Sequence, residues 1–238
     1  MRRVQTTQPI ERSPASSADP GAPGKDSGAE LVARLVGATV IFDDRPALRA
    51  VDLDLGAGLT MLRGPNGAGK TTALRALAGL LPLARGTRQG PPDVLYLGHR
   101  PQLLHGLTPR ENLRFFLDFR STTAPTGTSA AARRSQVASA LERWGLRDAA
   151  DRPVERLSAG QRRRAALARL DLEACDLVLL DEPFAELDDD AARLLRTSLG
   201  EIVPRSAALI ASHGHAELDA SASRVYELRD GAISRATA

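Results

Sequence analysis

The stretch GPNGAGKTT at residues 64–72 constrains the fold most, because it joins a strand-like segment to a helix-like segment through a glycine-rich loop. It follows the apolar run LTMLR and has the pattern Gly-x-x-x-x-Gly-Lys-Thr. Glycines let the backbone curl so that successive N–H groups point inward, and the N-terminus of the following helix adds positive potential. We therefore predict a loop that holds the phosphates of a nucleotide, formed by Gly64, Pro65, Asn66, Gly67, Ala68, Gly69, Lys70, Thr71 and Thr72.

Two side chains that follow the loop's last glycine suit a nucleotide. Lys70 is expected to reach the β- and γ-phosphates, and the Thr71 hydroxyl is expected to ligate Mg²⁺. The alternative is a glycine-rich turn before a helix, with no bound phosphate. The strand before the loop and the helix after it favour the phosphate site.

The run LVLLDEP at residues 177–183 supplies two carboxylates at the end of an apolar strand. Asp181 stands where a carboxylate can hold the magnesium through water. Glu182 points the other way, toward the place of an attacking water, and is the candidate general base. A strand-ending turn with solvated acids is the alternative.

The pattern of apolar segments predicts an α/β fold. The runs LVLL and ALIA are apolar on both faces, as central parallel strands covered by helices must be. No convincing strand lies between about 100 and 160, which predicts an inserted helical lobe, and the Asp-Gly pair of RDGAI predicts a final hairpin on the sheet edge. The predicted strands are 31–42, 48–55, 59–63, 94–97, 177–181, 207–212 and 224–228, and the predicted helices are 70–80, 109–119, 130–144, 160–173, 188–202 and 215–221.

Composition narrows the class of protein. Residues 1–29 are rich in Ser, Pro, Ala and Gly and predict a disordered tail, which leaves 30–238 for one folded domain. The 32 basic and 29 acidic side chains give a net charge of only +3, and aromatic residues make up 3%, so we expect no nucleic-acid partner. A single cysteine, Cys175, excludes an internal disulfide. No apolar run approaches the roughly 18 residues of a membrane span.

The stretch LSAGQRRRAALARL at residues 157–170 combines small residues with three consecutive arginines. Ser158, Ala159 and Gly160 form a cap at a helix N-terminus that leaves backbone donors and a hydroxyl open to an anion. The arginines at 162–164 fan out around the helix and cannot all face one ligand. We expect them to solvate the helix and to add a supporting charge near phosphates, rather than to contact nucleic acid.

The order of phosphate loop, LSAGQ and Asp-Glu-Pro strand resembles the ABC-type ATPases, whose signature commonly reads Leu-Ser-Gly-Gly-Gln, and the chain is identified as a member of that superfamily. The resemblance implies a P-loop NTPase core sheet with an antiparallel N-terminal β subdomain and an inserted α-helical subdomain. It also implies ATP and Mg²⁺ as ligands and a head-to-tail homodimer closed over two ATP molecules. In that dimer the signature of one copy contacts the γ-phosphate held by the other, through Ser158, Ala159, Gly160 and Gln161.

Two further positions match the superfamily after the Asp-Glu-Pro strand. FAELD resembles the D-loop, which places Asp188 against the partner's phosphate loop, although a simple helix N-cap acid would use the same residue. His213 resembles the switch histidine that bonds the γ-phosphate and is counted among the catalytic residues. A plain loop histidine is the alternative, and the nearby His215 could be mistaken for it.

Two positions before the signature leave alternatives open. Phe42 occupies the place where the superfamily stacks a ring on adenine, and a buried core phenylalanine is the alternative. The glutamine usual at the entrance to the helical lobe is absent from YLGHRPQLLHGL, so either His99 or Gln102 takes its task near the magnesium and the attacking water.

Three stretches together resemble the haem-exporter ATPase subunit of cytochrome c biogenesis: YLGHRPQLLHGLTPRENLRFF, LSAGQRRRAALARL and LLDEPFAELD. The family's Gly-His-Gln-Pro reads Gly98, His99, Arg100 and Pro101 here. The resemblance implies a translocase subunit that takes part in haem export. It also implies a peripheral position on the cytoplasmic side of the bacterial inner membrane, bound to integral-membrane subunits of a cytochrome c maturation complex. The alternatives are another single-cassette exporter, for a drug, lipid or peptide, and a soluble ATPase without a transport role.

Overall fold

The computed structural model describes residues 31–123, 129–213 and 221–236. The tail predicted at 1–29 lies outside these ranges, as does the helix predicted at 215–221 apart from residue 221. The strands are β1 Leu31–Phe42, β2 Arg45–Gly56, β3 Gly58–Arg63, β4 Arg85–Gln89, β5 Val94–Leu97, β6 Leu177–Asp181, β7 Ala207–Ala211, β8 Arg224–Arg229 and β9 Ala232–Arg235. The α-helices are α1 Lys70–Leu77, α2 Pro109–Thr123, α3 Ala130–Arg143, α4 Ala159–Leu167 and α5 Asp189–Ile202, with 3₁₀ turns at Arg147–Ala149, Val154–Arg156 and Ala168–Asp171.

The main sheet has six strands in the order β5-β6-β7-β3-β8-β9, and all neighbours except β8 and β9 are parallel. Every residue of β6 and β7 is buried, which confirms the prediction of central strands covered on both faces. The predicted terminal hairpin is also present, because β9 pairs antiparallel with β8 at the sheet edge. Its turn residues Asp230 and Gly231 have φ of 48° and 78°, the left-handed values that an Asp-Gly turn requires.

A second, antiparallel sheet has the order β2-β1-β4. The strand β4 is missing from our predictions because its sequence, RGTRQ, is polar and has little intrinsic strand propensity. Pairing with β1 makes it a strand. The two backbones lie so close at Gly86 that a Cβ there would stand 2.4 Å from the carbonyl oxygens of Val36 and Gly37.

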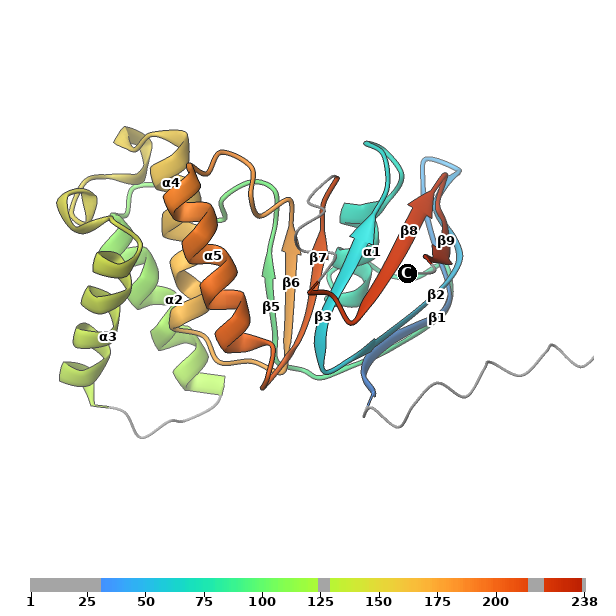
Figure 1. Cartoon of the computed structure of the whole chain (residues 1–238), viewed down its shortest axis with the longest axis horizontal. Helices are drawn as coiled ribbons and strands as arrows, with labels where there is room; N and C mark the ends of the chain where they lie inside the picture. The colour runs from blue at the N-terminus through green and yellow to red at the C-terminus, as the bar shows by residue number, and fades with distance from the viewer. Residues whose placement is uncertain (1–30, 124–128, 214–220, 237–238) are drawn as a thin grey trace, which may run out of the picture.

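Two apolar cores fill the space between the layers. The helix α1 lies between the two sheets, and its Leu74 and Leu77 share a core with Leu53 of β2 and Leu209 of β7. The opposite face of the main sheet packs against α5 and the helical layer, around the buried Trp144. Figure 1 shows α2, α3 and α4 gathered beyond β5 at one end of the molecule, with β1 and β2 at the other. The predicted helical insertion is therefore a separate layer beside the core sheet.

Two predicted helices end early, for local reasons. The helix predicted at 70–80 ends at Leu77, and Gly79 follows with φ of 75°, a left-handed residue that commonly terminates helices. The helix predicted at 160–173 is α-helical only to Leu167, after which the chain tightens into the 3₁₀ turn. Within the residues that the structure describes, no helix combines the length and the apolar character needed to cross a bilayer.

The close approach at Gly86 predicts a large effect of one added methyl group. Gly86→Ala should lower the free energy of unfolding by at least ~2 kcal/mol, because the residue has a left-handed φ and the new Cβ meets two carbonyls. Gly200→Ala is the matched control: it lies inside α5 with no atom within 4 Å of a built Cβ. That change should stabilise by ~0.5–1 kcal/mol. Urea unfolding followed by circular dichroism measures both, and equal effects would contradict the proposed clash.

Candidate functional site

The loop between β3 and α1 is built around glycines that no other residue could replace. Gly64 and Gly69 have φ of 148° and 105°. A Cβ on Gly64 would stand 2.1 Å from the Leu228 carbonyl oxygen, and one on Gly69 would stand 2.6 Å from the Ala47 carbonyl oxygen. The positive φ angles turn successive N–H groups toward a common concavity at the start of α1, which has no acidic residue in its first turn. The loop therefore has the backbone form of an anion cradle.

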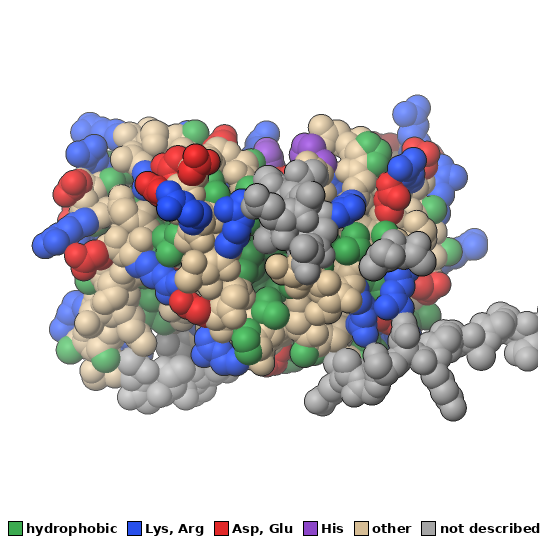
Figure 2. Space-filling model, in the orientation of Figure 1, with side chains coloured by type: hydrophobic (Ala, Val, Ile, Leu, Met, Phe, Trp, Pro, Cys, Tyr) green, Lys and Arg blue, Asp and Glu red, His purple; other side chains and the backbone are tan. Residues whose placement is uncertain are grey.

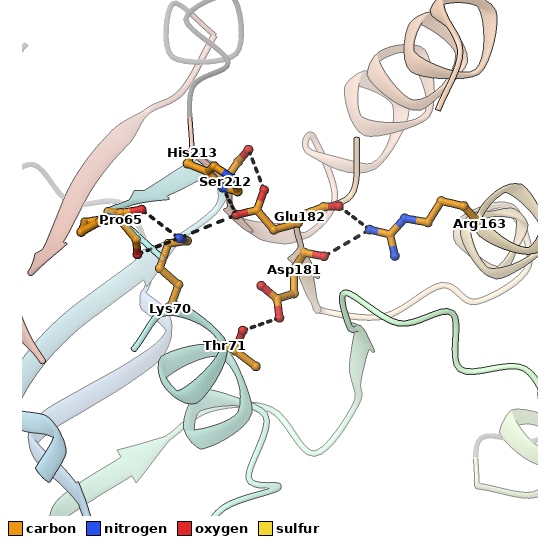
Figure 3. Close-up of polar contacts among 9 residues, drawn as sticks. Pro65, Lys70, Thr71, Arg163, Asp181, Glu182, Ser212 and His213 are labelled. Atoms are coloured by element: carbon orange, nitrogen blue, oxygen red, sulfur yellow. Dashed lines mark hydrogen bonds and ion pairs between the residues drawn. The ribbon is translucent and has the colours of Figure 1, made fainter. Parts of the chain in front are cut away.

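Lys70 lies inside this cradle. Its ammonium donates hydrogen bonds to the carbonyl oxygens of Gly64 (2.8 Å) and Pro65 (3.2 Å), and its side chain is only 7% exposed. It also stands 3.7 Å from the Glu182 carboxylate (Figure 3). The predicted phosphate lysine and the predicted general base thus face each other across the site.

Thr71 and Asp181, the two predicted magnesium ligands, are in direct contact. The Thr71 hydroxyl donates a 2.7 Å hydrogen bond to the Asp181 carboxylate, although 110 residues separate them in sequence. Asp181 is 1% exposed at the end of β6. A hydroxyl and a carboxylate are the hard oxygen donors that Mg²⁺ prefers, and Mg²⁺ usually takes only one or two protein carboxylates, so this pair fits the ion.

Glu182 faces His213 across the ends of β6 and β7. Its carboxylate lies 2.5 Å from Nδ1 of His213 and accepts a 3.3 Å hydrogen bond from the Ser212 hydroxyl. The residue has φ of 48°, a left-handed value that is strained for a side chain of this type, and its N–H bonds the Ala211 carbonyl at 2.9 Å. This backbone turn places the Glu182 and Asp181 carboxylates on different sides of the strand end (Figure 3). Ser212 was not among the predicted site residues, although a polar residue closing an apolar strand beside His213 was a usable signal.

Arg163 contradicts our expectation that the three arginines solvate their helix. It is 1% exposed and donates five hydrogen bonds to backbone carbonyls, including those of Asp181 and Glu182. Burial lowers the pKa of its guanidinium, and the nearby carboxylates of Glu186, Asp181 and Glu182 oppose that effect. Arg162 and Arg164 remain half-exposed, so the three side chains do fan out as helical geometry requires.

The signature residues form a capping box. The Ser158 hydroxyl oxygen accepts from the Gln161 N–H at 3.1 Å, and the Gln161 side chain accepts from the Ser158 N–H at 3.0 Å. Ser158 is exposed, and its hydroxyl proton remains available as a donor. In Figure 1, β5, β6 and β7 stand between α4 and α1, so the signature and the phosphate loop of one chain are apart.

Four other predicted positions are placed by the structure. Asp188 is the N-cap of α5 and accepts from the Ala191 N–H at 2.8 Å, so its capping role is confirmed. Phe42 is 47% exposed at the end of β1, and the alternative of a buried core phenylalanine is wrong. His99 and Gln102 are both exposed in the segment after β5, so either could take the task of the glutamine that is absent. His215, the residue that could be mistaken for His213, lies outside the described residues.

Comparison with known proteins agrees with this geometry. The ABC transporter family matches residues 48–185, a stretch that includes the phosphate loop, the signature and Asp181–Glu182. Three relatives share the description "Cytochrome c biogenesis ATP-binding export protein CcmA". The protein from Paracoccus denitrificans is 44% identical over 71% of this chain and 78% of its own length. Those from Cereibacter sphaeroides and Bordetella bronchiseptica are 45% and 40% identical, over 68% and 78% of this chain and 71% and 85% of their own lengths.

Two solved structures share the fold. An ATP-binding subunit of an ABC transporter has a TM-score of 0.75 at 21% identity, over 87% of this chain and 90% of its own. A dimeric ATP-binding cassette in a post-hydrolysis state, bound to ADP and Pi, has a TM-score of 0.74 at 20% identity, over 87% of this chain and all of its own. The core sheet, the antiparallel sheet and the helical layer are therefore those of an ABC ATPase. The chain belongs to the ABC transporter family, as an ATP-binding subunit that resembles the cytochrome c biogenesis export protein CcmA.

Proposed function

We propose that this ABC-type ATPase powers an export complex for cytochrome c biogenesis, with haem as the cargo. The observation that carries the hydrolytic part is the convergence of Lys70, Thr71, Asp181, Glu182 and His213 at one edge of the main sheet. The identities of 40% to 45% to CcmA proteins support the cytochrome c assignment. Haem itself is inferred from the resemblance of the sequence motifs.

The residues of the phosphate loop would bind the triphosphate. The loop N–H groups and the Lys70 ammonium supply positive charge, and the ammonium exchanges its bonds to Gly64 and Pro65 for bonds to phosphate oxygens. Thr71 and Asp181 are the residues that would hold Mg²⁺, directly and through water. When bound, the ion supplies Lewis-acid polarisation of the phosphate oxygens.

Glu182 is the proposed general base. Its carboxylate takes the proton of the water that attacks the γ-phosphate, a role worth about 10²- to 10⁴-fold in rate. In the structure the same carboxylate is engaged by His213, Ser212 and Lys70. When His213 and Lys70 turn to phosphate oxygens, one carboxylate oxygen becomes free to accept a proton. The base would thus be available only when the triphosphate is in place.

Hydrolysis requires a second copy in this proposal. One chain holds its signature away from its own phosphate loop, and the exposed N-terminus of α4 presents Ser158 and backbone donors outward. A head-to-tail homodimer would bring Ser158, Ala159, Gly160 and Gln161 of one copy to the γ-phosphate of the other. Asp188 would then contact the partner's phosphate loop, and the exposed Phe42 ring would stack on adenine. His99 or Gln102 would stand near the attacking water.

The helical layer is the proposed contact with integral-membrane subunits, on the cytoplasmic side of the bacterial inner membrane. Phe115 and Phe119 of α2 are 46% and 61% exposed, and their rings stack 6.2 Å apart at the wall of a cavity of about 690 Å³. Exposed apolar patches commonly mark protein contacts. Figure 2 shows basic and acidic side chains interspersed on the face in view, a distribution that does not favour a nucleic-acid surface.

A genetic experiment tests the whole proposal. Deletion of the gene in its own organism should abolish holo-cytochromes c, and the wild-type chain should restore them while Glu182→Gln should not. Haem staining of membrane proteins provides the readout. Co-purification from solubilised membranes should bring down integral-membrane subunits. Normal cytochromes c in the deletion strain would favour an exporter for a drug, lipid or peptide, and failure to recover any membrane subunit would favour a non-transport ATPase.

Glu182→Gln should lower kcat at least ~100-fold while the Kd for ATP changes less than ~3-fold, because only proton acceptance is lost. Phosphate release and nucleotide titration measure the two quantities. Gel filtration with ATP should show the variant held as a dimer. Glu142→Gln, on the exposed side of α3, is the matched control and should keep wild-type turnover. Normal hydrolysis by the Glu182 variant would reject the assignment of the base.

Thr71→Val keeps the shape of the side chain and removes the hydroxyl. The affinity for ATP with Mg²⁺ should fall ~10-fold, whereas the affinity measured with EDTA should change less than ~3-fold. Thr197→Val is the control, because the Thr197 hydroxyl bonds the Arg193 carbonyl within α5. Equal losses with and without the metal would show that Thr71 does not act through Mg²⁺.

Ser158→Arg should block dimer closure without affecting ATP binding to one chain, because the signature lies away from the chain's own phosphate loop. In the Glu182→Gln background, sedimentation with ATP should show monomers. Ser135→Arg on the exposed face of α3 should leave the dimer intact. An ATP-dependent dimer that forms normally in the Ser158→Arg variant would exclude the signature from the interface.

A further inference from the structure

Arg163 uses every hydrogen-bond donor of its guanidinium on the backbone. Nε donates to the Pro183 carbonyl at 3.2 Å, and Nη2 donates to Asp181 at 3.1 Å and Glu182 at 2.6 Å. Nη1 donates to Gly98 at 2.8 Å and His99 at 3.2 Å. A guanidinium has five N–H donors in a rigid fork, so these five bonds exhaust it. No other side chain type could occupy this position and satisfy the same carbonyls.

The five carbonyls belong to two segments that the site needs. One is Asp181–Glu182–Pro183, which contains the proposed metal ligand and the general base, and the other is Gly98–His99, at the entrance to the helical layer. Arg163 itself comes from α4, the helix whose N-terminus carries the signature. Figure 3 shows the side chain reaching from its helix to the backbone at the end of β6. A single buried side chain therefore ties three segments together.

The bond to Glu182 acts on a strained residue. Glu182 has a left-handed φ of 48°, and such conformations persist only when the surroundings fix them. Its N–H is fixed by Ala211 at 2.9 Å, and its carbonyl is fixed by Arg163 at 2.6 Å. With both backbone groups of the residue held, the side chain is directed at His213 and away from Asp181.

We propose that Arg163 is a positioning residue, which sets the direction of the Glu182 carboxylate and joins it to the signature helix. This proposal rests on the assignment of Glu182 as the base. It implies that the five hydrogen bonds of Arg163 couple two events in one chain. When the N-terminus of α4 contacts a nucleotide, the position of the Glu182 carboxylate changes with it. All five guanidinium donors of Arg163 bond protein carbonyls, so the side chain acts through the position of Glu182.

The test is a comparison of two buried arginines. Arg163→Ala should lower kcat at least ~10-fold and change the KM for ATP less than ~3-fold, because orientation of the base is lost and phosphate binding is kept. Arg169→Ala is the matched control, since Arg169 is 8% exposed in the next turn of the same segment and bonds the Glu173 carboxylate instead. It should lower thermal stability but leave kcat of the folded protein within ~2-fold of wild type.

Two further measurements separate positioning from general destabilisation. Added guanidinium ion, at millimolar concentrations below those that unfold the protein, should restore part of kcat to Arg163→Ala and none to Glu182→Gln. In the Glu182→Gln background, Arg163→Ala should cause no further loss, because residues that act through one group are not additive. If Arg163→Ala does not fold, Arg163→Lys keeps the charge and loses the fork, and should show the same kcat loss at unchanged KM.

The outcomes separate the positioning role of Arg163 from the assignment of Glu182 as the general base. A wild-type chain whose hydrolysis does not depend on Glu182 would overturn the assignment of the base, and the inference with it. A Glu182-dependent enzyme in which Arg163→Ala or Arg163→Lys retains wild-type kcat would overturn the inference alone. The same holds if the double variant loses activity additively or if guanidinium fails to restore turnover to a folded Arg163→Ala.

Discussion

Parallel pairing of β3, β7 and β6 brings the carboxyl ends of three strands to one edge of the main sheet, and the site depends on that constraint. The phosphate loop follows β3, Asp181 and Glu182 end β6, and His213 follows β7. Loops at this edge of an open α/β sheet are the usual place for a ligand. Because β6 and β7 are buried along their whole length, the register of the strands is fixed. The side chains at the ends of these strands are therefore brought together although they are distant in the sequence.

The charges at this edge offset one another in the protein alone. Lys70 is 7% exposed and bonds two carbonyls, with the Glu182 carboxylate 3.7 Å away. Glu182 in turn is engaged by His213 and Ser212. A buried charge is tolerated only when it is paired or hydrogen-bonded, so each group keeps a substitute partner that a phosphate would replace. These contacts are compatible with the proposed function, in which a triphosphate would take the place of some of these partners.

The features that motif reasoning placed correctly are those set by local backbone conformation. The glycine-rich turn before α1, the helix cap at Ser158 and the Asp-Gly hairpin each follow from the backbone conformation that a few neighbouring residues adopt. Thr71 and Asp181 are each expected beside one magnesium ion, and their direct hydrogen bond is a finding of the structure. The strand β4 was missed, since its polar sequence becomes a strand only through pairing with β1.

The sequence alone determined the α/β class, the glycine-rich loop before α1, the two carboxylates at the end of β6 and the membership of the ABC family. These depend on short-range patterns: glycine spacing, apolar runs and helix caps. Only the tertiary structure decided that Arg163 is buried and joins distant segments, whereas Arg162 and Arg164 are not buried. It also decided that Phe42 is exposed and that His213 and Ser212 face Glu182. The physical reason is that three consecutive arginines have the same local propensity, and what distinguishes them is the ring of carbonyls that distant segments place around one of them.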